Sequence, residues 1–142
     1  MEKNISLEIP YLESIDAKQI SALGLAYIGD AVYEIFVRSY VLSKGNTAVN
    51  KLHKASVGFV SAKAQSRIVH ALEDSLTEEE IAVFKRGRNA HSNTSAKNAD
   101  IVDYRHATGF EALIGYLFIC GKHQRIEQLI SLAFEFISNE NK

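Results

Sequence analysis

Two acidic residues stand where the surrounding sequence predicts burial. Asp30 interrupts the apolar run Leu25–Val32 directly after Gly29, and aspartate and glycine are both unfavourable inside a helix. Glu111 is the only acidic residue in the apolar segment between Tyr104 and Gly121. Acidic residues or glycines at positions where a buried helix disfavours them tend to mark functional sites. Asp30 and Glu111 are therefore the first candidates for chemistry.

Metal binding is the chemistry that these two acids could share. A buried pair of carboxylates is costly unless another charge compensates it. Mg²⁺ prefers oxygen ligands and is commonly held by one or two carboxylates together with water and substrate phosphate. Such an ion can activate a water molecule for attack on a phosphodiester. The spacing alone leaves a structural alternative open, in which each acid pairs with a nearby arginine or caps a helix.

The elements that must position both acids are helices. Apolar residues recur at helical spacing, and Pro10 is the only proline. We predict helices over residues 19–43, 47–56, 58–72, 77–88, 104–120 and 124–138. Asn46 is expected to cap the second helix, and Thr77 and Glu80 are expected to form a capping box at the start of the fourth helix. Residues 89–103 are predicted to form a polar loop. The expected fold is all-α, a bundle of six or seven helices.

Length and composition indicate one ordinary globular domain over residues 1–142, with residues 1–17 as an N-terminal extension. Hydrophobic residues make up 46% of the chain and charged residues 23%. The single cysteine, Cys120, excludes an internal disulfide framework and a cysteine-based zinc cluster. The sequence shows no secretory signal and no apolar run long enough to span a bilayer. We therefore expect a cytoplasmic protein with no membrane partner.

The residues around both acids resemble a known family. Leu25–Glu34, with the sequence Leu-Ala-Tyr-Ile-Gly-Asp-Ala-Val-Tyr-Glu, resembles the ribonuclease III signature, a Leu-Gly-Asp core on a long helix. Phe110–Gly115 resembles the second acidic motif of that family, Glu-Ala-Leu-Ile-Gly. The likeness extends over residues 20–137. Lys85–Ala90 and Tyr104–Arg105 are similar to the branch called Mini-ribonuclease III, the small bacterial form without a double-stranded-RNA-binding domain.

The resemblance implies a Mg²⁺-dependent endonuclease of double-stranded RNA, active as a homodimer and associated with maturation of the ends of the 23S ribosomal RNA precursor. By position, Asp30 and Glu111 take the catalytic and metal-binding roles. The alternative is a non-catalytic RNA-binding ribosome-assembly factor on the same fold. A small enzyme without a binding domain could also need a ribosomal protein on its substrate.

The chain departs from the larger members of the family at two acidic positions. Ala26 and Thr108 stand where those enzymes carry a glutamate and an aspartate. This departure leaves the number of bound metal ions open. Our hypothesis is one Mg²⁺ held by the remaining acids, with Glu34 or Asp103 assisting from outside the coordination sphere.

Charge is balanced overall but segregated along the chain. Sixteen Lys and Arg residues face seventeen Asp and Glu residues, for a net charge of −1. Residues 44–70 contain no acid, and residues 85–105 are the second basic stretch. Either stretch alone is typical of a solvent-exposed face, but the two together are suited to a surface that contacts the phosphates of RNA. The polar loop is predicted to contact the groove or backbone of the RNA, and the alternative is that it only connects two helices. The predicted RNA contacts are His53, Lys54, Lys63, Arg67, Lys85, Arg86, Arg88, Asn89 and Lys97.

A second surface is expected on the Gly-Asp helix itself. In the family this helix packs against its mate in the dimer. Leu23, Tyr27 and Ala31 share one face of the helix and are candidates for that interface. The equally weighted alternative places the same face in the core of a single chain.

Overall fold

The structure is a computed structural model that describes residues 9–90 and 100–140. Within those ranges it contains six α-helices, three short 3₁₀ helices and no strand, which confirms the predicted all-α class. No helix of the described residues is long and apolar enough to cross a membrane. The helices in chain order are η1 (Pro10–Ser14), η2 (Ala17–Gln19), α1 (Ala22–Lys44), α2 (Val49–Val60), α3 (Ala62–Leu72), η3 (Glu73–Ser75), α4 (Glu78–Asn89), α5 (Asp100–Ile119) and α6 (His123–Glu140).

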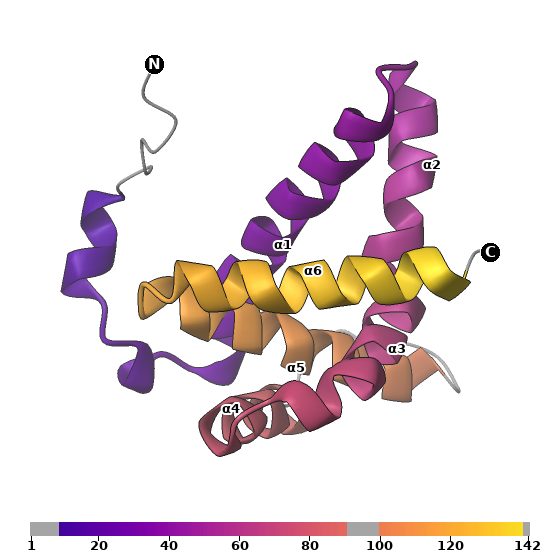
Figure 1. Cartoon of the computed structure of the whole chain (residues 1–142). Coiled ribbons are helices and arrows are strands. Elements are labelled where there is room, and N and C mark those ends of the chain that lie inside the picture. Colours follow the sequence, from indigo (N-terminus) through magenta and orange to yellow (C-terminus); the bar gives the residue numbers. More distant parts are fainter. Residues whose placement is uncertain (1–8, 91–99, 141–142) are drawn as a thin grey trace.

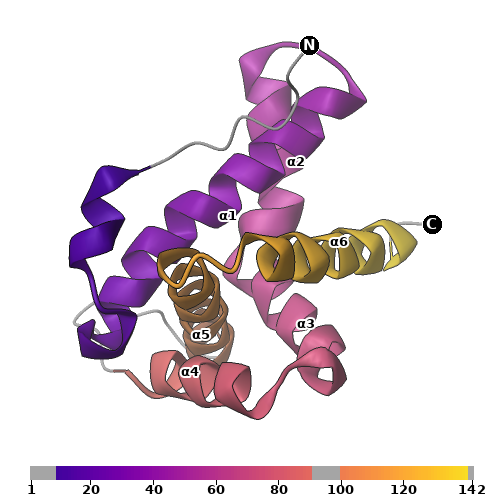
Figure 2. The same ribbon diagram turned by 60° about the vertical axis from the view of Figure 1, so that its left-hand side comes forward.

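Helix α5 forms the centre of the bundle. From Ala107 to Leu117 every residue except Glu111 is buried, as expected for a helix that is apolar on all sides. Helices α1, α3, α4 and α6 pack around α5, and Figure 2 shows α5 in the middle of these four. Helix α2 packs against α1, α3 and α6 instead, so it projects from the bundle beside α1 (Figure 1).

Helix α1 turns one face to the core and the other to solvent. Leu25, Val32 and Tyr33 are buried, and the Tyr33 ring meets Phe110 of α5 edge-on with 5.1 Å between the ring centroids. The stripe of Leu23, Tyr27 and Ala31 faces outward, so the alternative that placed it in the core of this chain is wrong. The physical reason is that Gly29, on another face of the helix, lets that face pack closely against the backbone of α5.

The break between the second and third predicted helices falls later than the sequence suggested. Helix α2 continues to Val60, and Ser61, not the region of Val57, separates it from α3. The Ser61 hydroxyl accepts a hydrogen bond from the Ala64 amide at 3.1 Å and caps α3. Asn46 does not cap α2: the N-cap residue is Ala48, whose side chain accepts no hydrogen bond.

The predicted polar loop is shorter than expected at its C-terminal end. Helix α5 begins at Asp100, so residues 100–103 are helical. Asp100 and Asp103 lie in its first turn, where negative charge is favourable for a helix. The capping box of α4 is confirmed: the Glu80 amide donates to the Thr77 hydroxyl at 3.1 Å, and the Thr77 amide donates to the Glu80 carboxylate at 2.9 Å. Residues 91–99 lie outside the described residues.

Candidate active site

Asp30 and Glu111 come together where α1 crosses α5. A Cβ atom on Gly29 would lie 1.7 Å from the Glu111 carbonyl oxygen, and one on Gly115 would lie 1.9 Å from the Leu25 carbonyl oxygen. Ordinary Cβ contacts begin at 3.4 Å, so only glycine allows the two backbones to approach this closely. Glycine at position 29 costs about 1 kcal/mol in helix propensity relative to alanine. The close helix crossing that it permits accounts for this otherwise unfavourable residue.

The two carboxyl groups perturb each other. The Asp30 side chain is exposed, and the Glu111 side chain is half-buried. Burial, and next the charge of Asp30, raises the pKa of Glu111 to about 8, while a hydrogen bond from Gln65 opposes the rise. A carboxyl group with such a raised pKa beside a second acid is typical of functional sites.

The donor set at this crossing fits one divalent cation. A cation between the carboxylates would offset both the burial and the repulsion that raise the pKa of Glu111, and hard cations such as Mg²⁺ take carboxylate oxygens as ligands. Ala26 and Thr108 are buried and add no carboxylate, and the Thr108 hydroxyl donates to the Tyr104 carbonyl within α5 at 3.0 Å. Among the described residues no group of three His, Cys, Asp or Glu side chains could hold a metal ion. Water and substrate oxygens would have to complete the coordination.

The two acids expected to assist from further away differ in position. Glu34 lies one turn after Asp30 on α1, and its negative charge contributes to the raised pKa of Glu111. Its carboxylate accepts a hydrogen bond from Arg38 at 3.0 Å. Asp103 lies two turns before Glu111 on α5, about 12 Å along the helix axis. Only Glu34 therefore belongs to the surroundings of the acid pair.

One residue at this site, Gln65 of α3, was not predicted from the sequence. Its side chain is buried, with 2% of its surface exposed, and its amide nitrogen donates to the Glu111 carboxylate at 3.3 Å and to the Val60 carbonyl at 2.9 Å. The available signal was a glutamine placed three and four residues before Ile68 and Val69, on the apolar side of the helix, because glutamine seldom lies inside a protein without partners. Nothing in the sequence, however, indicated that Glu111 was the partner.

Some of the predicted RNA contacts form hydrogen bonds within the chain, although Arg67 and Arg86 are exposed. Lys54, Lys63 and Lys85 are exposed. Arg67 donates two hydrogen bonds to Glu140 at the end of α6, and the two side chains form an ion pair within the chain. The Arg side chains of α4 are also engaged. Arg86 donates to the Ile20 carbonyl at 3.3 Å and Arg88 to the Asn89 side chain at 3.2 Å, while Lys97 lies outside the described residues.

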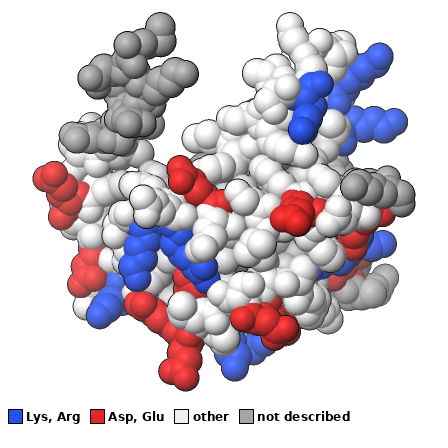
Figure 3. All heavy atoms as spheres, viewed as in Figure 1, with Lys and Arg blue, Asp and Glu red and all other residues white. Residues whose placement is uncertain are grey.

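Figure 3 shows how charge lies on one face of the molecule. Lys and Arg side chains stand apart from acidic ones at the end where α1 turns into α2, whereas both signs mix over the rest of this face. Residues Lys44, Lys51 and Lys54 of these two helices are exposed. The separation of basic from acidic residues along the sequence is therefore also present on the surface near α2.

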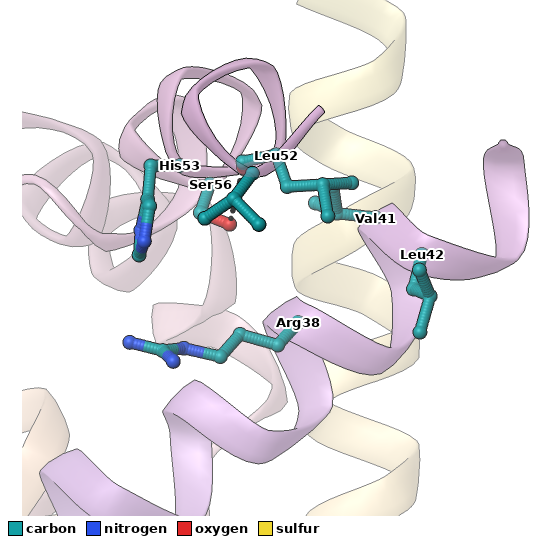
Figure 4. Close-up of a pocket in the computed structure, with 7 residues that line it drawn as sticks. Arg38, Val41, Leu42, Leu52, His53 and Ser56 are labelled. Atoms are coloured by element: carbon teal, nitrogen blue, oxygen red, sulfur yellow. Dashed lines mark hydrogen bonds between the residues drawn. The ribbon is translucent and has the colours of Figure 1, made fainter. Parts of the chain in front are cut away.

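His53 lies beside a pocket rather than alone on a surface. The pocket has a volume of about 160 Å³ between α1 and α2, and Figure 4 shows Arg38 and His53 on the same side of it. Apolar side chains such as Val41 and Leu52 form much of the lining. His53 and Arg38 thus place two side chains capable of contacting phosphate next to one another.

The interface candidates on α1 form an exposed apolar stripe. The exposed fraction is 39% for Leu23 and 84% for Tyr27, and Ala31 is also exposed. Ile35 extends the stripe with 65% of its surface exposed. A single Tyr or Ile on a surface is ordinary, but a continuous stripe along one helix is typical of an interaction surface.

Comparison with known proteins agrees with this geometry. The ribonuclease III domain matches residues 23–122, a range that holds both acids. Mini-ribonuclease 3 of Clostridium tetani is 54% identical over 128 residues, covering 89% of this chain and 85% of the relative. Mini-ribonuclease 3 of Enterococcus faecalis is 48% identical over 129 residues, covering 89% and 98%.

A solved structure gives the same result for the fold. A crystal structure of a protein from Fusobacterium nucleatum superposes with a TM-score of 0.78 at 30% identity, covering 85% of this chain and 99% of that one. The family model extends over most of the chain, and the two relatives match it over nearly nine-tenths of its length. The chain therefore belongs to the ribonuclease III family, among the Mini-ribonuclease 3 proteins.

Proposed function

We propose that this protein is a Mg²⁺-dependent endoribonuclease that cleaves double-stranded RNA. The observation that carries the proposal is the convergence of Asp30 and Glu111 at the glycine crossing of α1 and α5. Both acids lie in the range that matches the ribonuclease III domain. Two adjacent carboxylates in a chain of this family are suited to holding a cation against a phosphodiester.

The residues of the chain have distinct tasks in this proposal. Asp30 and Glu111 hold the ion, and the rigid helix crossing fixes the distance between them. When bound, Mg²⁺ supplies activation of a water molecule and stabilisation of negative charge on the phosphate. Because Ala26 and Thr108 provide no further carboxylate, we propose one ion for each chain. Glu34 adds negative potential near the site without joining the pair.

The substrate that the family resemblance implies is the precursor of 23S ribosomal RNA at its paired ends. Double-stranded RNA is recognised mainly through phosphates, 2′-hydroxyl groups and helix shape. The exposed lysines of α2 and α3, Lys51, Lys54 and Lys63, suit contacts of that kind because they come from a stretch without acids. A ribosomal protein that prepares the RNA would be a further partner.

We also propose that the chain forms a homodimer through the exposed stripe of α1. Leu23, Tyr27 and Ala31 lie on the outward face of the helix whose inward side borders the acid pair. Burying these side chains against a second copy would remove apolar surface from water. It would also place two sites, one in each chain, on opposite sides of one interface.

Cleavage of long double-stranded RNA tests this proposal. Wild type, Asp30→Asn and Glu111→Gln are incubated with Mg²⁺ or with a chelator, and Glu127→Gln serves as a matched control because Glu127 is an exposed acid of α6. We expect Mg²⁺-dependent cleavage by wild type and Glu127→Gln, and a loss of at least about 100-fold in both site variants. RNA binding should persist in all four proteins.

Two other results would contradict the proposal. RNA binding without cleavage in every sample, also with a 23S precursor duplex and ribosomal protein present, would favour the non-catalytic assembly factor. Cleavage that survives the chelator, or that persists in both site variants, would show that Asp30 and Glu111 do not form the active site.

A further inference from the structure

The junction between α2 and α3 rests directly on the candidate active site. The last carbonyl groups of a helix have no partner within it. At the end of α2 two side chains bind these groups: the Tyr33 hydroxyl donates to the Phe59 carbonyl at 2.8 Å, and the Gln65 amide donates to the Val60 carbonyl at 2.9 Å. Tyr33 comes from the same helix as Asp30. Gln65 also donates to Glu111, so the junction and the acid pair share a side chain.

The position of Gln65 is energetically unfavourable in one respect, and its hydrogen bond at the α2–α3 junction does not explain why. Its amide nitrogen serves the Val60 carbonyl and the Glu111 carboxylate, but its side-chain oxygen is buried and has no hydrogen-bond partner among the described residues. An unpaired buried acceptor is unfavourable. A water molecule held at the acid pair is the type of donor that would satisfy it.

The chemistry of an amide suits a task beside a metal-binding carboxylate. A lysine or arginine in place of Gln65 would neutralise Glu111 and repel a cation. A neutral amide donates a hydrogen bond, fixes the orientation of the carboxylate and leaves its charge for the metal. Groups that orient metal ligands in this way contribute strongly to metal affinity in other proteins.

We propose that Gln65 is a positioning residue that holds the Glu111 carboxylate in the orientation needed to bind a divalent cation, and ties that carboxylate to the α2–α3 junction. This inference rests on the proposed function, because it assigns a task within the same site. Gln65 acts through Glu111 and need not touch the substrate. Its loss should therefore weaken metal binding more than RNA binding.

The test compares Gln65→Met with Tyr33→Phe. Methionine has a similar length to glutamine but donates no hydrogen bond, so it removes both contacts of the amide. Tyr33→Phe removes the other hydrogen bond at the junction and leaves the contact between Gln65 and Glu111 intact. Thermal unfolding is followed during titration with Mn²⁺, because a ligand that binds the folded state raises the Tm with a midpoint set by its affinity. RNA cleavage is measured over the same metal concentrations.

We expect Gln65→Met to raise the Mn²⁺ midpoint about tenfold or more. Its kcat at low metal should fall and then recover at high metal, with the KM for RNA unchanged. Tyr33→Phe should lower the Tm without metal but keep the wild-type midpoint. This pattern supports positioning, because a residue needed only for the junction would not change the metal requirement.

The inference is overturned if Gln65→Met shifts the midpoint no more than Tyr33→Phe does. It is also overturned, together with metal binding at the acid pair, if Mn²⁺ does not change the Tm of wild type. A wild type that cleaves no RNA while the two variants still separate in Mn²⁺ midpoint would contradict the proposed ribonuclease function and support the task of Gln65.

Discussion

Replacing Gly29 with alanine should both destabilise the protein and separate Asp30 from Glu111. The added methyl group would lie 1.7 Å from the Glu111 carbonyl oxygen, where ordinary contact requires 3.4 Å, so α1 and α5 must move apart by about 1.7 Å. Overpacking of this kind costs up to about 3 kcal/mol, and alanine returns about 1 kcal/mol through its better helix propensity. The net loss is about 2 kcal/mol, equivalent to a fall in Tm of roughly 6 °C for a chain of this size.

The activity should fall further than the stability. A misplacement of about 1 Å among reacting groups can cost roughly 100-fold in rate, so we expect kcat/KM for RNA cleavage to drop by at least that factor. Gly58→Ala is the matched control because it makes the same change inside helix α2, where a Cβ would meet nothing within 4 Å. It should keep full activity and gain up to about 1 kcal/mol. A Gly29→Ala protein as stable and active as wild type would refute the close crossing.

Three further predictions concern acid stability, RNA affinity and assembly. Hydrogen bonds from Arg125 hold the pKa of Glu80 below its ordinary value, so their stabilisation is present above about pH 4.3, the ordinary pKa of a glutamate, and is lost as the pH falls below that value. Arg125→Met should lower the free energy of unfolding by about 2–3 kcal/mol at pH 7 and flatten that acid dependence in thermal melts; an unchanged pH profile would contradict this. Lys54→Ala and Lys63→Ala should each weaken RNA binding and reduce the slope of log affinity against log salt by about 1, whereas equal slopes would exclude phosphate contacts. Tyr27→Glu should shift the protein from dimer to monomer in analytical ultracentrifugation, and a dimer that persists would place the interface elsewhere.

The helices could be predicted from the sequence where local signals were strong. The Thr77–Glu80 capping box and the uniformly apolar segment of α5 are local patterns, and the structure contains both. The orientation of α1 was harder, because apolar residues lie on two of its faces. The face toward α5 is decided by Gly29, whose role depends on a backbone far along the chain.

The candidate site was predictable only in part for the same reason. Asp30 and Glu111 stood out because each is an acid in apolar surroundings, and the structure brings them together. Arg67 appeared to be a free cation in an acid-free stretch, but Glu140 lies beside it in the folded chain. Gln65 carried no charge and no motif, so only its contact with Glu111 identifies it. Pairings between distant residues depend on tertiary packing, which local patterns do not contain.

The most direct measurement of the central claim is the number of divalent cations bound to each chain. Mn²⁺ accepts the same oxygen ligands as Mg²⁺ and can be counted by electron paramagnetic resonance. We expect about one tightly bound Mn²⁺ for each wild-type chain, as one carboxylate pair implies. Asp30→Asn and Glu111→Gln should each abolish this binding while the fold remains intact. Unchanged Mn²⁺ binding in both variants would contradict the proposal that these two acids form one metal-binding active site.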